Sequence, residues 1–185
     1  MDLDSVLKDS ASKMAKSCAM LKDQFSGLRT GKASPALVEN VSVIYYGTPT
    51  RLRDLANITT PEARLISITP YDPSALGDIA KAIQAANLGV TPMNDGRVVR
   101  VPIPELDEER RKEIVKKVKG EGETARISLR NARRDAVEAF KKAQKDGMSE
   151  DEQKDGEAQV QKLLEKYTKL MDVELEKKEK EVMTV

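Results

Sequence analysis

The first stretch of the chain carries apolar residues at the spacing of an α-helix that packs along one side. Within residues 3–29 they recur at intervals of seven, four, three, four and three. This heptad-like spacing places them on one stripe, with lysines and polar residues between them. We therefore expect one long helix here. Its buried side comprises Leu7, Met14, Cys18, Leu21, Phe25 and Leu28.

A second helical pattern follows residue 104. Asp107 is placed to cap it, and the two glutamates that follow favour a helix N-terminus through the helix dipole. Gly120 and Gly122 lie inside the pattern, and each costs about 1 kcal/mol relative to alanine, so a local bend stays open. The apolar side of this helix comprises Ile114, Val118, Ala125, Leu129, Ala132, Ala136 and Phe140.

A third helix begins with a capping box, because Ser149 is followed three residues later by Glu152. Each of the three helices has one apolar stripe that it cannot bury alone, so we expect them to form a three-helix bundle. The apolar side of the last helix comprises Val160, Leu163, Leu164, Tyr167, Leu170, Met171 and Leu175.

The stretch between the first two helices has a different character. Residues 41–46 and 64–69 are rich in β-branched residues and predict strands, and Gly47-Thr48-Pro49 predicts the turn that closes the first. Asp72-Pro73-Ser74 is expected to start a helix. Asn94-Asp95-Gly96 predicts a turn between two further short strands. These elements make a small β/α/β module.

Together the patterns predict an α+β protein of two domains. Residues 1–30 and 105–185 form the long three-helix bundle, and residues 31–104 form the inserted α/β domain. Two neighbouring stretches, Thr30–Pro35 and Val101–Leu106, connect them. Such a double connection is suited to a hinge, although its prolines restrict the backbone, so a mobile and a rigid connection both stay open.

Composition removes most enzyme classes. The chain has no histidine and only one cysteine, Cys18. It therefore lacks the commonest general base and the residues of a His- or Cys-rich metal site, and we expect neither a catalytic centre nor a metal. The acidic N-terminus is unlike a signal peptide, and no apolar run is long enough for a membrane span. We expect a cytoplasmic protein that acts away from membranes.

The net charge of +1 hides one basic helix. From Arg126 to Lys145 there are seven basic and two acidic residues. Arg126, Arg130, Arg133 and Arg134 fall within roughly 100° of arc on a helix. Arginine suits phosphate contact because its guanidinium offers a planar fork of donors. The pattern alone favours a plain solvated face, or pairing of Arg133 and Arg134 with acids of the last helix, over RNA binding.

Several motifs in register resemble the bacterial ribosome recycling factor family over essentially the whole chain. The last of these motifs is the basic segment of the second helix, in which Asn131 lies among the arginines. The motifs are Leu28-Arg29-Thr30-Gly31-Lys32-Ala33-Ser34-Pro35, Tyr45-Tyr46-Gly47-Thr48-Pro49-Thr50, Asn87-Leu88-Gly89, Arg100-Val101-Pro102-Ile103-Pro104, Glu108-Glu109-Arg110-Arg111-Lys112 and Ala125-Arg126 through Arg130-Asn131-Ala132-Arg133-Arg134-Asp135.

The chain departs from the family pattern at five positions. Lys32 stands where arginine is frequent, Arg51 where proline is frequent and Asn87 where aspartate is frequent. Asp107 replaces a common threonine cap, and Gly122 stands where alanine is usual. None of these changes removes an arginine of the basic set.

The resemblance implies an L-shaped factor, expected to be a monomer, that binds the post-termination ribosome. With elongation factor G and GTP it would separate the subunits so that they can reinitiate translation. It would have no cofactor of its own, because elongation factor G uses the GTP. The bundle would bind the large subunit and its ribosomal RNA. The alternative is a helical adaptor or chaperone-like module, which would show an exposed apolar groove.

The resemblance also implies particular site residues. Arg111, Arg130 and Arg133 would be the main ribosomal RNA contacts, and helix geometry adds Arg126 and Arg134. The hinge would comprise Thr30, Gly31, Pro102 and Pro104.

Overall fold

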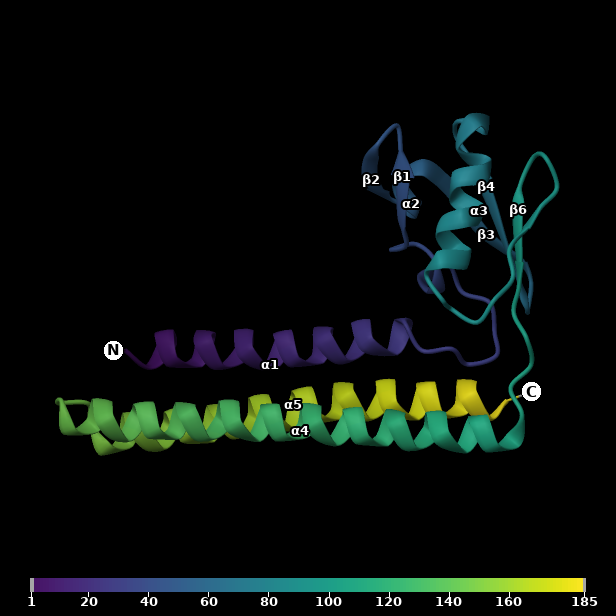
Figure 1. Cartoon of the computed structure of the whole chain (residues 1–185). Coiled ribbons are helices and arrows are strands. Elements are labelled where there is room, and N and C mark those ends of the chain that lie inside the picture. The colour runs from purple at the N-terminus through teal and green to yellow at the C-terminus, as the bar shows by residue number, and fades with distance from the viewer. Residues whose placement is uncertain (1, 185) are drawn as a thin grey trace. The chain divides into compact units, whose positions relative to one another are not determined.

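The computed structural model describes residues 2–184, which divide into two compact units (Figure 1). One unit takes the chain up to Phe25 and again from Lys112 to Thr184, and the other takes Ser26–Arg111. The first is made of long helices and the second contains a small sheet, which confirms the predicted α+β class with two domains. The domain boundaries and the hinge stay predictions.

The helical unit is a bundle of α1 (Leu3–Ser26), α4 (Glu108–Lys145) and α5 (Glu150–Met183). In Figure 1 α4 runs antiparallel to the other two. Among residues 2–184, no helix is both long and apolar enough to cross a membrane.

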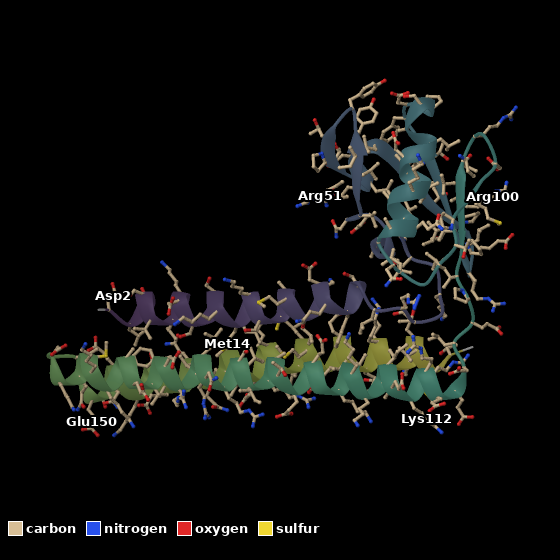
Figure 2. All side chains as sticks on the ribbon, in the orientation of Figure 1. Asp2, Met14, Arg51, Arg100, Lys112 and Glu150 are labelled. Carbon is tan, nitrogen blue, oxygen red and sulfur yellow. The ribbon has the colours of Figure 1, made fainter. Side chains whose placement is uncertain are left out.

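The buried stripe of α1 differs in part from the predicted one. Its buried residues include Val6 and Ser10 in place of Leu7, which is only half-buried. Met14, labelled in Figure 2, is fully buried. Ser10 and Val6 lie four and eight residues before it, so the 3.6-residue period places them on the same side of the helix. Burial of Ser10 is compatible with the core, since its hydroxyl donates to the Val6 carbonyl at 2.8 Å. The helix also ends earlier than predicted, at Ser26.

The start of α4 and its glycines follow from local chemistry. Asp107 caps the helix as predicted, accepting the Arg110 backbone N–H at 2.7 Å. The helix continues without interruption through both glycines. A Cβ at Gly122 would lie 2.5 Å from Leu175 Cδ2 of α5, whereas a Cβ at Gly120 would meet nothing within 4 Å. Gly122 therefore allows α4 and α5 to approach closely.

The first turn of α5 is the predicted capping box. Ser149 Oγ accepts the Glu152 backbone N–H, and the Glu152 carboxylate accepts the Ser149 backbone N–H at 3.0 Å. These hydrogen bonds lower the pKa of Glu152. The helix also shows one error of the sequence interpretation: Leu170, expected in the core, is 49% exposed.

The second unit contains a four-stranded antiparallel sheet and a separate hairpin. The sheet has the order β3 (Ala56–Glu62), β4 (Leu65–Pro70), β6 (Val99–Pro102) and β5 (Met93–Asn94). Within residues 2–184, β1 (Ser42–Tyr45) pairs only with β2 (Thr48–Arg51). Helix α3 (Leu76–Ala85) turns its buried residues toward a core shared with these strands. The remaining elements are η1 (Pro35–Leu37), α2 (Leu52–Leu55) and η2 (Pro73–Ala75).

The turns of this unit correct two details. The first hairpin turns at Tyr46 and Gly47, both with positive φ, so Thr48 and Pro49 belong to β2 and not to the turn. Asp72 does cap, but it caps the short 3-10 helix η2 that precedes α3. Asp72 also accepts a 2.7 Å hydrogen bond from the Tyr45 hydroxyl, which raises the pKa of Tyr45 to about 12.

Candidate nucleic-acid interface on α4

Four arginines of α4 lie along one flank of the helix, beside its buried stripe. They project there because Ala125, Leu129 and Ala132, buried in the bundle, fix how the helix is rotated. Arg126 and Arg133 border this stripe and are half-buried, whereas the two other arginines, Arg130 and Arg134, are exposed. The exposure of the four arginines therefore increases with their distance around the helix from the buried stripe.

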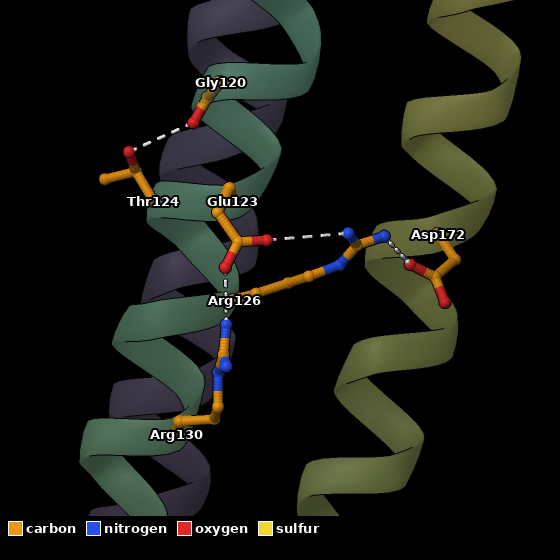
Figure 3. A network of polar contacts seen from close by, with 6 residues as sticks. All are labelled: Gly120, Glu123, Thr124, Arg126, Arg130 and Asp172. Carbon is orange, nitrogen blue, oxygen red and sulfur yellow. Dashed lines mark hydrogen bonds and ion pairs between the residues drawn. The ribbon is translucent and has the colours of Figure 1, made fainter.

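Glu123 is the centre of the polar network on this flank (Figure 3). Its Oε1 accepts a 2.6 Å hydrogen bond from Arg130 Nη2, and its Oε2 lies 3.8 Å from Arg126 Nη1. On the other side, Arg126 Nη2 donates to Asp172 Oδ1 of α5 at 2.6 Å. Arg126 is therefore held between two carboxylates and ties α4 to α5.

The two remaining arginines, Arg133 and Arg134, form no ion pair with a described carboxylate. Arg133 Nη1 donates to Gln161 Oε1 of α5 at 3.3 Å, a long contact with a neutral group. Arg134 forms no ion pair with any described residue. The alternative that Arg133 and Arg134 pair with acids of the last helix is therefore wrong for the described residues. The arginine that pairs with an acid of α5 is Arg126, whose partner is Asp172.

The ion pairs on this flank are weak enough to exchange. The side chains of Arg130 and Glu123 are 56% and 55% exposed. An ion pair between exposed groups contributes only about 0.2–1 kcal/mol, since water screens it and two long side chains must be ordered. A phosphate that offers several charge-assisted hydrogen bonds can replace such a carboxylate. Glu123 therefore holds Arg130 only weakly, and the guanidinium can be released to a phosphate.

The other predicted site residues lie elsewhere. Arg111 is half-buried in the first turn of α4, nineteen positions before Arg130, and is not part of the network around Glu123. Thr30 is buried, and Gly31 has a φ of +78°. Pro102 ends β6 and Pro104 follows it, both exposed.

The comparisons with known proteins agree on one family. The family model described as "Ribosome recycling factor" matches residues 21–183. The chain belongs to this family. It is 48% identical to the ribosome-recycling factor of Parabacteroides distasonis, covering 100% of both chains, and 48% identical to that of Bacillus licheniformis, covering 97% of this chain and 98% of the relative. The resemblance inferred from the motifs is confirmed.

Two solved structures of recycling factors are also similar. A solution structure of the ribosome recycling factor gives a TM-score of 0.85 at 39% identity, over 100% of this chain and 99% of that one. The other comprises models for the T. thermophilus ribosome recycling factor and the E. coli elongation factor G bound to the E. coli post-termination complex. It gives a TM-score of 0.71 at 39% identity over 100% of both chains.

The sequence reasoning missed the two carboxylates that organise the arginines of this recycling factor family member. A signal for Glu123 was present: among residues 110–145, it is the acid whose helical phase falls on the arginine arc. Its spacings of three and seven residues to Arg126 and Arg130 place the three on one flank. Asp172 had no comparable signal, because its partner lies on another helix.

Proposed function

We propose that this chain recycles ribosomes in the cytoplasm. It binds the post-termination ribosome and, with elongation factor G and GTP, separates the subunits so that they can reinitiate translation. Membership of the recycling factor family carries this proposal. The similar factor from T. thermophilus, bound with elongation factor G to the post-termination complex, supports both partners.

The arginine flank of α4 is the surface we assign to large-subunit ribosomal RNA. Arg133 and Arg130 are the main contacts: one is held only by a neutral amide and the other by an exchangeable pair. Arg134 can add a contact without losing one. Arg126 has a mainly structural role, because Asp172 and Glu123 already hold its guanidinium. Arg111 contributes separately from the first turn.

The mechanism is mechanical. With its arginines docked on phosphates, the bundle acts as a lever that transmits a displacement produced by elongation factor G. The uninterrupted α4 has 38 residues and is about 57 Å long. Packing against two other helices stiffens it. GTP hydrolysis belongs to elongation factor G, and the chain itself supplies binding and rigidity.

Subunit separation is the direct test of the function. Post-termination ribosomes would be incubated with the chain, elongation factor G and GTP and then separated on sucrose gradients. Free subunits should appear only when all three components are present. Intact ribosomes in the complete reaction would reject the function.

Cosedimentation with large subunits tests the RNA-binding surface. Arg133→Ala should lower the affinity by about tenfold, the range of one charge-assisted hydrogen bond, and should reduce the salt dependence by about one phosphate contact. Arg97→Ala, which removes an exposed arginine from the other unit, is the matched control. Equal binding by both variants, with unchanged circular dichroism, would remove Arg133 from the surface.

A further inference from the structure

An apolar groove lies between α1 and α5, within the helical unit. It has a volume of about 430 Å³ and is lined by Leu7, Lys8, Ala11, Gln159, Lys162, Leu163 and Lys166. We refer to it as the α1–α5 groove. The two helices meet closely further along, where Cys18 Sγ lies 3.8 Å from the Tyr167 carbonyl oxygen.

The groove is separate from the arginine flank. Gln161 and Asp172, which contact the arginines of α4, lie on one flank of α5. By the 3.6-residue period, Leu163 and Lys166 lie on the opposite flank, toward α1. A ligand in the groove would therefore not compete directly for the arginines.

An exposed apolar stripe extends the groove along α5. Leu170 and Val173 are 49% and 61% exposed, and they follow Leu163 at the spacings of seven and ten residues that keep them on one side of a helix. From Gln159 to Val173 this surface is about 21 Å long. Its length and periodicity match about four turns of another helix rather than a compact small molecule. A fourth helix in the groove would bury an apolar stripe that the three-helix bundle leaves in water.

The charged residues that line the groove are all lysines. Its lining contains Lys8, Lys162 and Lys166 and no acidic residue. Among residues 2–184, no carboxylate forms an ion pair with any of these three ammonium groups. Lysine stems can cover the apolar edges of a partner while their ammonium groups reach its carboxylates.

We propose that the α1–α5 groove binds an acidic amphipathic helix of a protein partner. The apolar side of the partner helix packs on Leu7, Ala11, Leu163 and the stripe beyond them, and its flanking carboxylates pair with the lysines. This is recognition of a helix in a groove, in which residues at heptad spacing supply the anchors. The surface is additional to the ribosomal RNA interface and does not depend on it.

A synthetic peptide tests this on the full chain. The probe is a fluorescent peptide about three heptads long, with leucine at positions a and d and glutamate with alanine elsewhere. Fluorescence anisotropy should show saturable binding, and a scrambled peptide of the same composition should bind about tenfold more weakly. Amide NMR shifts should change at Ala11 and Leu163. An absence of saturable binding, equal binding of the scrambled peptide, or shifts confined to other helices would overturn the proposal.

Charge reversal provides the matched comparison. Lys162→Glu with Lys166→Glu should weaken peptide binding by about tenfold or more, because like charges then face each other. Lys141→Glu with Lys145→Glu makes the same charge change on exposed positions of α4 and should have little effect. Equal losses in the two variants would show non-specific attraction and overturn the proposal.

Competition experiments distinguish a protein helix from other ligands that the groove could bind. Dodecanoate and a short RNA duplex should each fail to displace the bound peptide. Displacement by dodecanoate would assign the groove to fatty acids, and displacement by the duplex would assign it to RNA. Either result would overturn the assignment to a protein helix.

Discussion

Glu123→Gln is the substitution that best separates an arginine flank made for phosphate from an ordinary charged surface. Glu123 accepts a 2.6 Å hydrogen bond from Arg130 and lies 3.8 Å from a second guanidinium nitrogen, on Arg126. If Arg130 binds phosphate, it must first leave this carboxylate. Glutamine keeps the shape of the side chain but removes its charge, so Arg130 becomes easier to release.

The expected size of the effect follows from exposure and distance. The side chains of Arg130 and Glu123 are both more than half exposed. Without their ion pair, the free energy of ribosome binding should become more favourable by about 0.2–1 kcal/mol. Removal of the carboxylate also relieves its repulsion of a phosphate; at a separation of about 6 Å in water this amounts to ~0.7 kcal/mol before salt screening. Together these effects should tighten large-subunit binding by about four- to fifteenfold at low salt.

The assay is cosedimentation with large subunits over a series of salt concentrations. Glu138→Gln is the matched control, because Glu138 is exposed on the same helix and its loss changes the net charge equally. Glu138 forms no ion pair with a described residue. Glu123→Gln should bind more tightly than Glu138→Gln, and the difference should shrink as salt rises.

Two results would refute this reasoning. Equal affinities of the two glutamine variants would mean that Glu123 does not compete with the ribosome for Arg130. Weaker binding by Glu123→Gln would mean that the carboxylate holds Arg130 in its binding conformation, so its role would be positioning.

Three further predictions concern the fold. Gly120→Ala should raise the free energy of unfolding by about 1 kcal/mol. Gly122→Ala should be about 1–3 kcal/mol less stable than Gly120→Ala in urea unfolding, since only a Cβ at position 122 meets a neighbouring side chain. The lowered pKa of Glu152 means that its capping contribution is present above the ordinary pKa of 4.5 and lost as pH falls through the folded value; Ser149→Ala should cost about 0.5–2 kcal/mol at neutral pH and flatten this acid dependence. In an ultraviolet titration one tyrosine should ionise near pH 12, and Tyr45→Phe should abolish that step.

The parts of the fold that the sequence predicts best are those set by local chemistry and long periodicity. The three long helices, the Asp107 cap and the capping box at Ser149 each depend on residues within a few positions of one another. The stripe of α4 is also correct, because seven apolar positions fix its phase.

The errors arise where tertiary contacts decide. Leu170 has the spacing of a core residue but lies on the side of α5 that no helix of the bundle covers. The small sheet is harder to predict, since β3 is mostly exposed and carries little apolar alternation. The sequence predicts that the four arginines share one flank of the helix, but it does not predict which of them are held in ion pairs. Asp172, 46 residues after Arg126, decides which arginine is held by α5, and no local pattern indicates that contact.

The rate of subunit splitting, followed by light scattering at sub-saturating factor concentration, tests most directly whether this chain recycles ribosomes through the arginine flank of α4. The chain with elongation factor G and GTP should split post-termination ribosomes. The Arg130→Ala/Arg133→Ala variant, with its circular dichroism unchanged, should split them about tenfold more slowly or worse. Splitting by the double variant at the rate of the unaltered chain would contradict the account.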